Sequence, residues 1–447
     1  MPPAAAHGIP RHGIPREVQR NTWLLFLAQA CLSTGLTTAA QLGSLIVYSL
    51  TGTAVLSGLP SAITALTVAS TGYPAGRFMD RRGRRPGLMI GFLVGALGAL
   101  LVASGVTTGR FAGYLSGAVV FSIGIAVGQL SRAAVADMYP ASRRGGAVGL
   151  VVTGGLLGGL GGPMLVALGT RIARAVGANP LAVPWLFVTG TFGLAVGAVS
   201  RLRPDPREIG TRIAEYFPDP RPADDRAGDD APPNSQWGGQ VSRQGSVAEI
   251  IGSRQAQAAM VALACAQAAM TILMATSSLM MSFHGHSIST ISLALMAHVT
   301  GMFGLSVPVG RLADRVGRRP VLIGGALLTA ASGLMFTLGV HSALIASVAF
   351  YLVGLGWCLA YVAGAALLGD VSTAATRARV VSISDVLTHA TAMVAALTAG
   401  ILLSRGGEVT VGILAAVLGS LPLLAILRAG GAPTRLPAAV PIEGGGR

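Results

Sequence analysis

Twelve stretches of this chain are apolar and long enough to cross a lipid bilayer. They cover residues 22–50, 53–75, 87–105, 110–136, 145–169, 183–200, 255–282, 288–309, 321–340, 342–369, 380–403 and 409–428. A spanning helix needs about 20 mostly apolar residues, and it satisfies its own backbone hydrogen bonds inside the lipid. Residues 201–253 are instead rich in Pro, Asp, Gly, Arg and Ser, which is typical of an aqueous linker. The pattern predicts an all-α membrane protein with six spans, a linker and six more spans.

The composition agrees with lipid as the main solvent. Hydrophobic residues make up 52% of the chain and charged residues only 11%, whereas a soluble domain carries about 25% charged residues. All 32 basic residues other than His are Arg, and they gather in the gaps between apolar stretches rather than along one helix face. The net charge of +15 therefore indicates membrane topology and no nucleic-acid partner. Cys31, Cys265 and Cys358 lie inside apolar stretches without metal-ligand spacing, so we expect no metal and no cofactor.

The arginines also predict an orientation. With the N-terminus in the cytoplasm, all but four of them (Arg110, Arg171, Arg174 and Arg405) fall on the cytoplasmic side, as positively charged loops do. We therefore expect a monomeric multi-pass protein of the cell membrane with both termini in the cytoplasm. Its predicted parts are a tail (1–21), a six-helix bundle (22–200), the linker (201–253), a second six-helix bundle (254–428) and a C-terminal tail (429–447).

The chain contains an internal repeat. The segment Gly76-Arg-Phe-Met-Asp-Arg-Arg-Gly-Arg-Arg-Pro86 recurs 234 positions later, from Gly310 to Pro320, with eight of eleven residues identical. The segment 137–144 recurs in weaker form as 370–377, at an offset of 233. Two repeats with nearly the same offset predict two parallel, pseudo-symmetric halves.

The twelve-span plan and the repeated Gly-Arg-x-x-Asp-Arg-x-Gly-Arg-Arg resemble the major facilitator superfamily, over the whole chain except the linker and tails. In that family the motif marks the loop between spans 2 and 3, with an echo between spans 8 and 9. The resemblance implies the major facilitator fold, transport of a small molecule by rocker-type alternating access, and no enzymatic activity. It also implies that Asp80 faces a helix N-terminus of the other half and holds the cytoplasmic side closed.

We expect this conformational latch to comprise both copies of the signature and the loop after span 4. Gly76 and Gly83 are expected to allow tight turns and close helix approach, and Asp80 is expected to bind neighbouring guanidinium groups. The full predicted set is Gly76, Arg77, Asp80, Arg81, Gly83, Arg84, Asp137, Arg144, Gly310, Asp314 and Arg318. The alternative is that these arginines only fix the membrane topology.

Span 5 carries a second resemblance. Gly149, Gly158, Gly162 and Pro163 follow the spacing that marks drug/proton antiporter-type exporters in the same superfamily. The exporter pattern continues with two further glycines, where this chain has Val166 and Ala167. Ordinary packing of small residues between helices is the alternative. The family's arginine in mid-span 4 is missing near Val120; Arg132 lies three turns later, and we expect it to pair locally with Asp137.

Ion coupling is the energy source that the sequence favours, because a chain without Lys cannot form a nucleotide-binding loop. Ionisable groups inside spans are costly and are therefore candidate functional sites. Asp385 and His389, one turn apart in span 11, and His298 in span 8 are the candidate proton carriers. The alternative for Asp385 is pairing with signature arginines, and for the histidines hydrogen bonding within the bundle.

The substrate cavity is expected at the midplane between the halves. Candidate lining residues are Gln29, Gln267, Thr271, Met274, Trp357 and Tyr361. Since no pair of cationic residues is available at mid-depth, neutral or cationic amphiphiles fit best. The sequence thus predicts proton-coupled export of a small apolar or cationic organic compound. Import or facilitated passage of a metabolite is the alternative, and a non-transporting sensor or a membrane enzyme is a further one.

Overall fold

The computed structural model of this protein describes residues 14–217, 247–372 and 376–429, except the side chains at 141, 142, 144, 145, 152, 377, 378 and 382. Within these ranges every regular element is a helix. The centre of the predicted linker (218–246) and most of both predicted tails lie outside the described residues.

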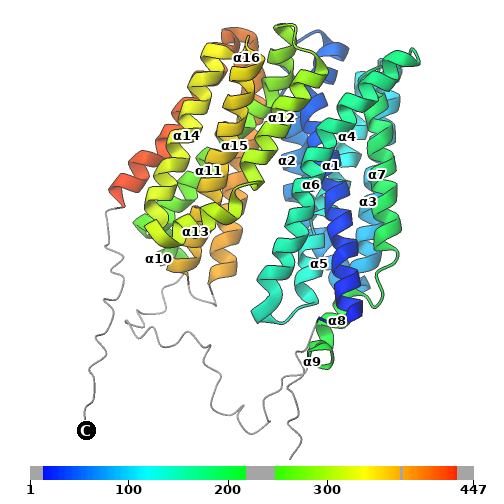
Figure 1. The fold of residues 1–447 in the computed structure, drawn as a ribbon, viewed down its shortest axis with the longest axis vertical. Helices are drawn as coiled ribbons and strands as arrows, with labels where there is room; N and C mark the ends of the chain where they lie inside the picture. Colours follow the sequence, from blue (N-terminus) through cyan, green and yellow to red (C-terminus); the bar gives the residue numbers. More distant parts are fainter. Residues whose placement is uncertain (1–13, 218–246, 373–375, 430–447) are drawn as a thin grey trace, which may run out of the picture.

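The first half of the chain forms seven helices that follow the predicted spans closely (Figure 1). They are α1 (Arg16–Thr51), α2 (Leu59–Arg82), α3 (Arg84–Thr107), α4 (Phe111–Gly128), α5 (Ser131–Asp137), α6 (Ala141–Ala175) and α7 (Val183–Val199). The predicted fourth span is divided between α4 and α5. Two short helices, α8 (Pro206–Thr211) and α9 (Ile213–Tyr216), begin the linker, and α10 (Val247–Gly252) ends it.

The second half repeats this plan. Its helices are α11 (Arg254–Phe283), α12 (Ile288–Phe303), α13 (Ser306–Val316), α14 (Arg318–Gly339), α15 (Ala343–Val371) and α16 (Arg377–Arg428). Helix α16 is two spans in one, because Gly407 interrupts it with a φ of 65°. Pseudo-symmetry is visible in the signature segments, since α3 begins after Gly83 at φ 100° and α14 begins after Gly317 at φ 91°.

Together these helices supply the twelve spans. By length and composition alone, nine helical segments of the described chain are able to cross a membrane. One of these segments is α16, which contains two spans. Helix α7 is apolar but shorter, and α2 is long enough but ends in the charged signature. The predicted fold of two six-helix bundles is confirmed.

Small residues let the helices of each bundle approach closely. A Cβ on Gly98 of α3 would collide with the backbone of Phe121 on α4, and one on Gly333 of α14 would meet the backbone of Ala416 on α16. Aromatic rings fill the wider spaces in the first half, where the ring of Phe192 lies 5.7 Å from Phe92 and 5.3 Å from Phe121. These contacts make each half a packed unit with its own core.

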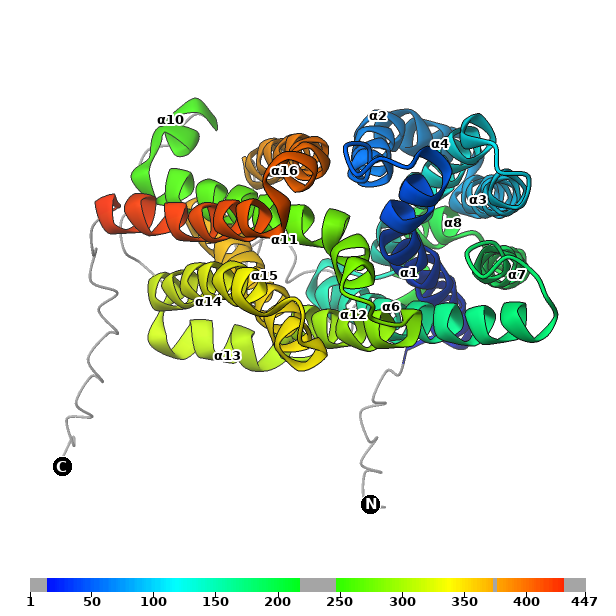
Figure 2. The same cartoon turned by 90° about the horizontal axis from the view of Figure 1, so that it is seen from above.

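The two halves lie side by side, with α6 against α12 and α2 against α16 (Figure 2). We call the membrane side that carries α8, α9 and Gly83 the linker side, and the opposite side the far side. On the far side Gln41 donates to Ser292 across the halves at 2.7 Å, and the ring of Tyr48 lies 5.1 Å from that of Phe283. Among the described residues no hydrogen bond or ion pair joins the halves on the linker side. The halves are therefore held together on the far side.

The start of the linker packs back onto the first half. Asn21 of α1 donates to the carbonyl oxygen of Pro204 at 2.9 Å, and Arg20 donates to that of Arg203. The ring of Phe217 lies 5.9 Å from that of Tyr139. We call residues 203–217 the clasp. It extends the first half beyond the end of its last span.

Candidate functional site

A cavity of about 350 Å³ lies between the two halves. Its walls are mostly apolar and include Phe121, Leu295, Met270, Met274 and Met302. Polar side chains reach it from both halves; they include Ser33, Thr37, Thr64, Ser122, Gln129, Arg132, Gln267, Thr271, His298 and His389. A mostly apolar pocket with a few polar groups is typical of a binding site for a small organic molecule.

Gln267 of α11 is the centre of a polar chain on the second half. Its Oε1 accepts a hydrogen bond from Trp357 Nε1 at 2.8 Å, and its Nε2 donates to Thr271 at 3.3 Å. Gln267, Thr271 and Met274 all line the cavity, as expected. Trp357 and Tyr361 were also expected in the lining, but they are not among the described residues that form it. Their rings are stacked on each other at 4.8 Å with an interplanar angle of 11°.

Gln29 lies elsewhere than expected. It is buried in the first half, where its Oε1 accepts a hydrogen bond from Ser131 of α5 at 3.0 Å. Its Nε2 contacts Ser33 at 3.4 Å, and Ser33 is the residue that reaches the cavity. Gln29 therefore supports the wall of the cavity from behind.

Arg132 corrects a second expectation. The structure pairs Asp137 with Arg84 and places Arg132 on the cavity wall, one helical turn beyond Gln129. No hydrogen bond or ion pair of its side chain is present in the described part of the chain. A guanidinium group inside a membrane protein's cavity is a functional-site candidate. Sequence reasoning missed it because Asp137, five residues away, offered a plausible local partner.

The three candidate proton carriers differ in their surroundings. His298 is only 3% exposed, and its Nδ1 donates to the carbonyl oxygen of Phe350 at 3.1 Å. His389 lines the cavity, and its Nδ1 donates to the backbone carbonyl of Asp385 at 2.8 Å. Asp385 and His389 are both exposed on α16. Neither lies in an ion pair with a signature arginine among the described residues.

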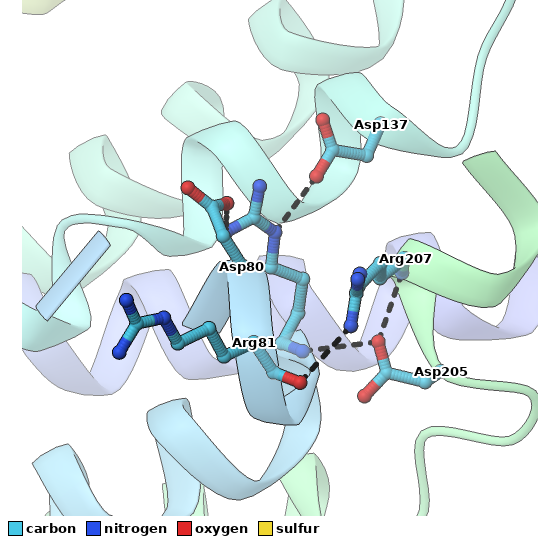
Figure 3. A network of polar contacts seen from close by, with 6 residues as sticks. Asp80, Arg81, Asp137, Asp205 and Arg207 are labelled. Carbon is cyan, nitrogen blue, oxygen red and sulfur yellow. Dashed lines mark hydrogen bonds and ion pairs between the residues drawn. The ribbon is translucent and has the colours of Figure 1, made fainter. Parts of the chain in front are cut away.

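The first signature forms a compact ion network (Figure 3). Arg84 binds Asp80 at 2.7 Å and Asp137 at 2.8 Å, so one guanidinium group links α2, α3 and α5. The second signature repeats it, with Arg318 at 2.5 Å from Asp314 and 3.3 Å from Asp370. The two networks brace the linker-side ends of both halves in the same way. Arg144 was expected to join them, but its side chain lies outside the described residues.

The signature is helical up to its second glycine, which differs from the expected loop. Gly76 and Gly310 lie inside α2 and α13, and a Cβ on Gly76 would meet nothing within 4 Å. The role in a turn and in close helix approach that was expected of Gly76 is therefore not seen in this conformation. Gly83 and Gly317 do make the turn, since both have positive φ. Arg77 contacts the Tyr73 hydroxyl at 3.1 Å instead of Asp80.

The clasp adds a contact that the sequence did not reveal. Asp205 accepts hydrogen bonds from the backbone N–H groups of Arg84 at 3.0 Å and Arg85 at 2.8 Å, at the start of α3. Arg207 donates to the carbonyl oxygen of Arg81 at 3.2 Å, as Figure 3 shows. A carboxylate at a helix N-terminus satisfies free N–H groups and is favoured by the helix dipole. The first signature is thus anchored by a residue from beyond the sixth span.

The glycines of the predicted exporter motif differ in what surrounds them. A Cβ on Gly158 of α6 would collide with the carbonyl oxygen of Ala30 on α1, and one on Gly162 would lie 2.7 Å from that of Thr34. Gly149 has nothing within 4 Å. Pro163 lies inside α6 without interrupting the helix. Gly158 and Gly162 therefore serve close packing of α6 on α1, and the structure is silent on a role in export.

Two similar helical bundles around a central cavity are the architecture of a secondary transporter. The chain belongs to the Major Facilitator Superfamily, whose family model matches residues 25–233 and 259–444. It is therefore a multi-pass membrane transporter and not an enzyme.

Relatives and solved structures agree with this family. The chain is 29% identical over 373 residues to the uncharacterized MFS-type transporter YdeG of Bacillus subtilis (strain 168), covering 83% of this chain and 82% of that protein. It is 27% identical over 404 residues to the riboflavin transporter RfnT of Brucella anthropi, covering 88% of this chain and 91% of that one. The inward-open structure of the xylose transporter XylE from E. coli shares the fold with a TM-score of 0.70 at 14% identity, covering 94% of this chain and 98% of that one.

Proposed function

We propose that this protein is a proton-coupled exporter that moves a small, largely apolar organic molecule by alternating access. One observation carries the proposal: the cavity lies between halves that are joined by hydrogen bonding only on the far side among the described residues. A rocking motion that opens the far side and closes the linker side would expose the same cavity to the other compartment. The moving bodies are the bundles 22–200 and 254–428, with the clasp carried by the first.

In this proposal the linker side faces the cytoplasm. The distribution of arginines supports the orientation, because all but four of them lie on that side, within the tails or within the linker. The structure then represents an inward-open state of the transport cycle. Export begins with a molecule entering the cavity from the cytoplasm or the inner leaflet.

We also propose that Asp80 closes the linker side in the opposite state. Helices α2 and α16 are antiparallel neighbours: Gly58, just before α2, faces the carbonyl oxygen of Ala396, and Gly400 faces that of Val55. Asp80 lies near the opposite end of α2, on the linker side, where α16 begins at Arg377. A carboxylate there would face the free N–H groups of a helix N-terminus.

The proton carriers in this proposal are Asp385 and His389. His389 lines the cavity, and because its Nδ1–H is held by the Asp385 carbonyl, its Nε2 is the nitrogen free to take up a proton. Asp385 lies one turn nearer the linker side on the same helix. His298 is the third candidate and reaches the cavity from α12. The glycines of α6 that resemble an exporter motif support the direction of transport.

Uptake of a metabolite is the second candidate function. It is favoured by the similarity to a protein named as a riboflavin transporter and by the stacked rings of Trp357 and Tyr361 beside the cavity, which suit a planar ring system.

The direction is tested with everted membrane vesicles and a compound panel that contains riboflavin together with neutral, cationic and anionic aromatics. Export predicts uphill accumulation in vesicles acidified inside, and its loss when a protonophore is added. Accumulation only in right-side-out vesicles would establish uptake instead. A panel that is not moved in either preparation by the wild-type protein would count against transport of this class of molecule.

A further inference from the structure

The charges on the cavity wall are all of one sign. Arg132 is the only residue with a permanent charge among the described residues that line the cavity, and Asp and Glu are missing from that lining. His298 and His389 can only add positive charge. A cavity lined only by neutral and positively charged groups repels organic cations and attracts organic anions. This outcome differs from the cationic or neutral substrate that the sequence favours.

Arg132 is available to a ligand. Arg132 is exposed and lines the cavity, and the described residues provide its side chain with no hydrogen-bond or ion-pair partner. The nearest carboxylate along the chain, Asp137, is occupied by Arg84 at 2.8 Å. Gln129 lies three residues before Arg132 on the same wall and can add an amide donor. A guanidinium group offers paired donors that match a carboxylate.

An aromatic stack adjoins the same cavity in the other half. Trp357 of α15 donates to Gln267, which lines the cavity, and its ring is stacked on that of Tyr361. Phe303, which lines the cavity, lies 6.3 Å from the Trp357 ring. Tyr361 is 48% exposed, so the stack is not sealed inside the bundle. Arg132 and the stack belong to different halves of the protein.

We propose that the transported molecule is an aromatic organic anion whose carboxylate binds Arg132 and whose ring packs against the Trp357–Tyr361 stack. This inference rests on the proposed transport function and names the substrate class of its cavity. Because the two contacts come from opposite halves, one molecule bridges them when the linker side closes. Closure removes water from Arg132, and an unpaired guanidinium group would then be strongly disfavoured. The bound anion offsets that cost, so the loaded protein closes more readily than the empty one.

The test uses the full-length protein in lipid nanodiscs and three matched ligand pairs. Each pair is an aromatic carboxylate and its uncharged primary amide: benzoate, 1-naphthoate and 9-anthroate with their amides. Binding is measured by titration calorimetry. For the best-bound pair, the wild-type protein is expected to bind the acid about tenfold more tightly than the amide, the order given by one charge-assisted bidentate contact.

Substitutions assign the preference to Arg132. Arg132→Gln is expected to remove the preference for the acid over the amide, and Arg132→Lys to retain part of it. Trp357→Leu is expected to weaken acid and amide by the same factor. Arg110→Gln, an exposed far-side arginine, is the matched control and should behave as the wild-type protein.

Three results would overturn the inference: equal affinity of acid and amide for the wild-type protein, an acid preference that survives Arg132→Gln, or binding of none of the six compounds. The proposed transport function is judged separately. If vesicles accumulate neutral or cationic compounds uphill while the acids neither bind nor move, the transport function stands and the anion site is wrong.

Discussion

Asp205 caps the first turn of α3 by accepting a hydrogen bond from the backbone N–H of Arg84 at 3.0 Å. The two residues are 121 positions apart, and six-helix packing brings them together. The second half carries the same ion network at Arg318, and within the described residues, which end at 429, no side chain caps the start of α14.

The cap is expected to contribute measurable stability. Asp205→Ala removes the acceptor of three backbone N–H groups, those of Arg84 and Arg85 at the start of α3 and that of Arg207 in α8. Loss of an acidic helix cap costs roughly 0.5–2 kcal/mol. We expect a lower midpoint of thermal unfolding for the purified protein in detergent. Glu208→Ala is the control, because Glu208 is exposed and lies 3.8 Å from Arg212. Equal midpoints for both variants would contradict a capping role.

The two ion networks are expected to differ in strength. Arg84 has a side chain only 16% exposed and makes contacts of 2.7 and 2.8 Å, whereas Arg318 is 26% exposed and one of its contacts is 3.3 Å. Arg84→Gln should therefore cost about 1–3 kcal/mol of unfolding free energy, and Arg318→Gln roughly 1 kcal/mol or less. Denaturation curves of the two variants, recorded side by side, measure this. A larger loss for Arg318→Gln would reverse the ranking.

Gln41 is expected to control the far-side closure. It is fully buried and donates to Ser292, but its Oε1 has no partner, which is costly for a buried acceptor. Gln41→Met removes that unpaired oxygen, and Ser292 keeps its bond to the carbonyl oxygen of Ile288. We expect Gln41→Met to stabilise the closed far side and slow transport.

Ser292→Ala should have the opposite effect, because it leaves both polar ends of Gln41 unpaired in the closed state. The readout is labelling of Leu295→Cys, a cavity position, by an impermeant thiol reagent applied from the far side. Labelling should decrease with Gln41→Met and increase with Ser292→Ala. A change of the same sign in both would contradict this account.

Asp385 is expected to be required for coupling to the proton gradient. Asp385→Asn keeps the size of the side chain and removes its ability to release a proton, so uphill transport should be lost while downhill exchange persists. His389→Gln should lower the rate more mildly if Asp385 is the main carrier. Glu215→Gln, outside the spans on α9, is the control. Undiminished uphill transport by Asp385→Asn would exclude it as the carrier.

Alanine substitution of two glycines in α6 is expected to affect stability differently. An added methyl group at Gly158 would overlap the backbone of Ala30, which should cost about 1–3 kcal/mol of unfolding free energy. Gly149→Ala meets open space and should change stability by roughly 1 kcal/mol or less. Thermal unfolding of both variants measures the difference. Similar losses at the two positions would show that the packing at Gly158 is less tight than described.

Much of the fold could be predicted because spans are local features of the sequence. Apolar length predicted every spanning helix, with ends up to seven residues away from those observed. The repeated signature predicted that Arg84 and Arg318 hold equivalent places. The points at which helices are interrupted were harder to predict. The interruption at Gly407 and the division between α4 and α5 depend on local backbone angles and not on hydropathy.

The cavity was less predictable because side-chain direction depends on helix rotation. Gln267, Thr271 and Met274 lie on one face of α11 and line the cavity as predicted. Gln29 lies on the face of α1 that packs on Ser131, which its sequence neighbours do not reveal. The roles of Asp205 and Arg132 were missed because both depend on residues that are distant in the sequence. Asp205 caps a helix 121 residues earlier, and Arg132 is left without Asp137 because Arg84 binds that carboxylate.

Alternating access is tested most directly by measuring distances across the two sides of the membrane in one protein. Spin labels at Tyr73 and Val381 report the linker side, and labels at Val55 and Val409 report the far side, after replacement of Cys31, Cys265 and Cys358. The account predicts that substrate and a proton gradient shorten the first distance while they lengthen the second, by electron–electron double resonance in nanodiscs. Distances that stay fixed, or that change in the same direction on both sides, would contradict it.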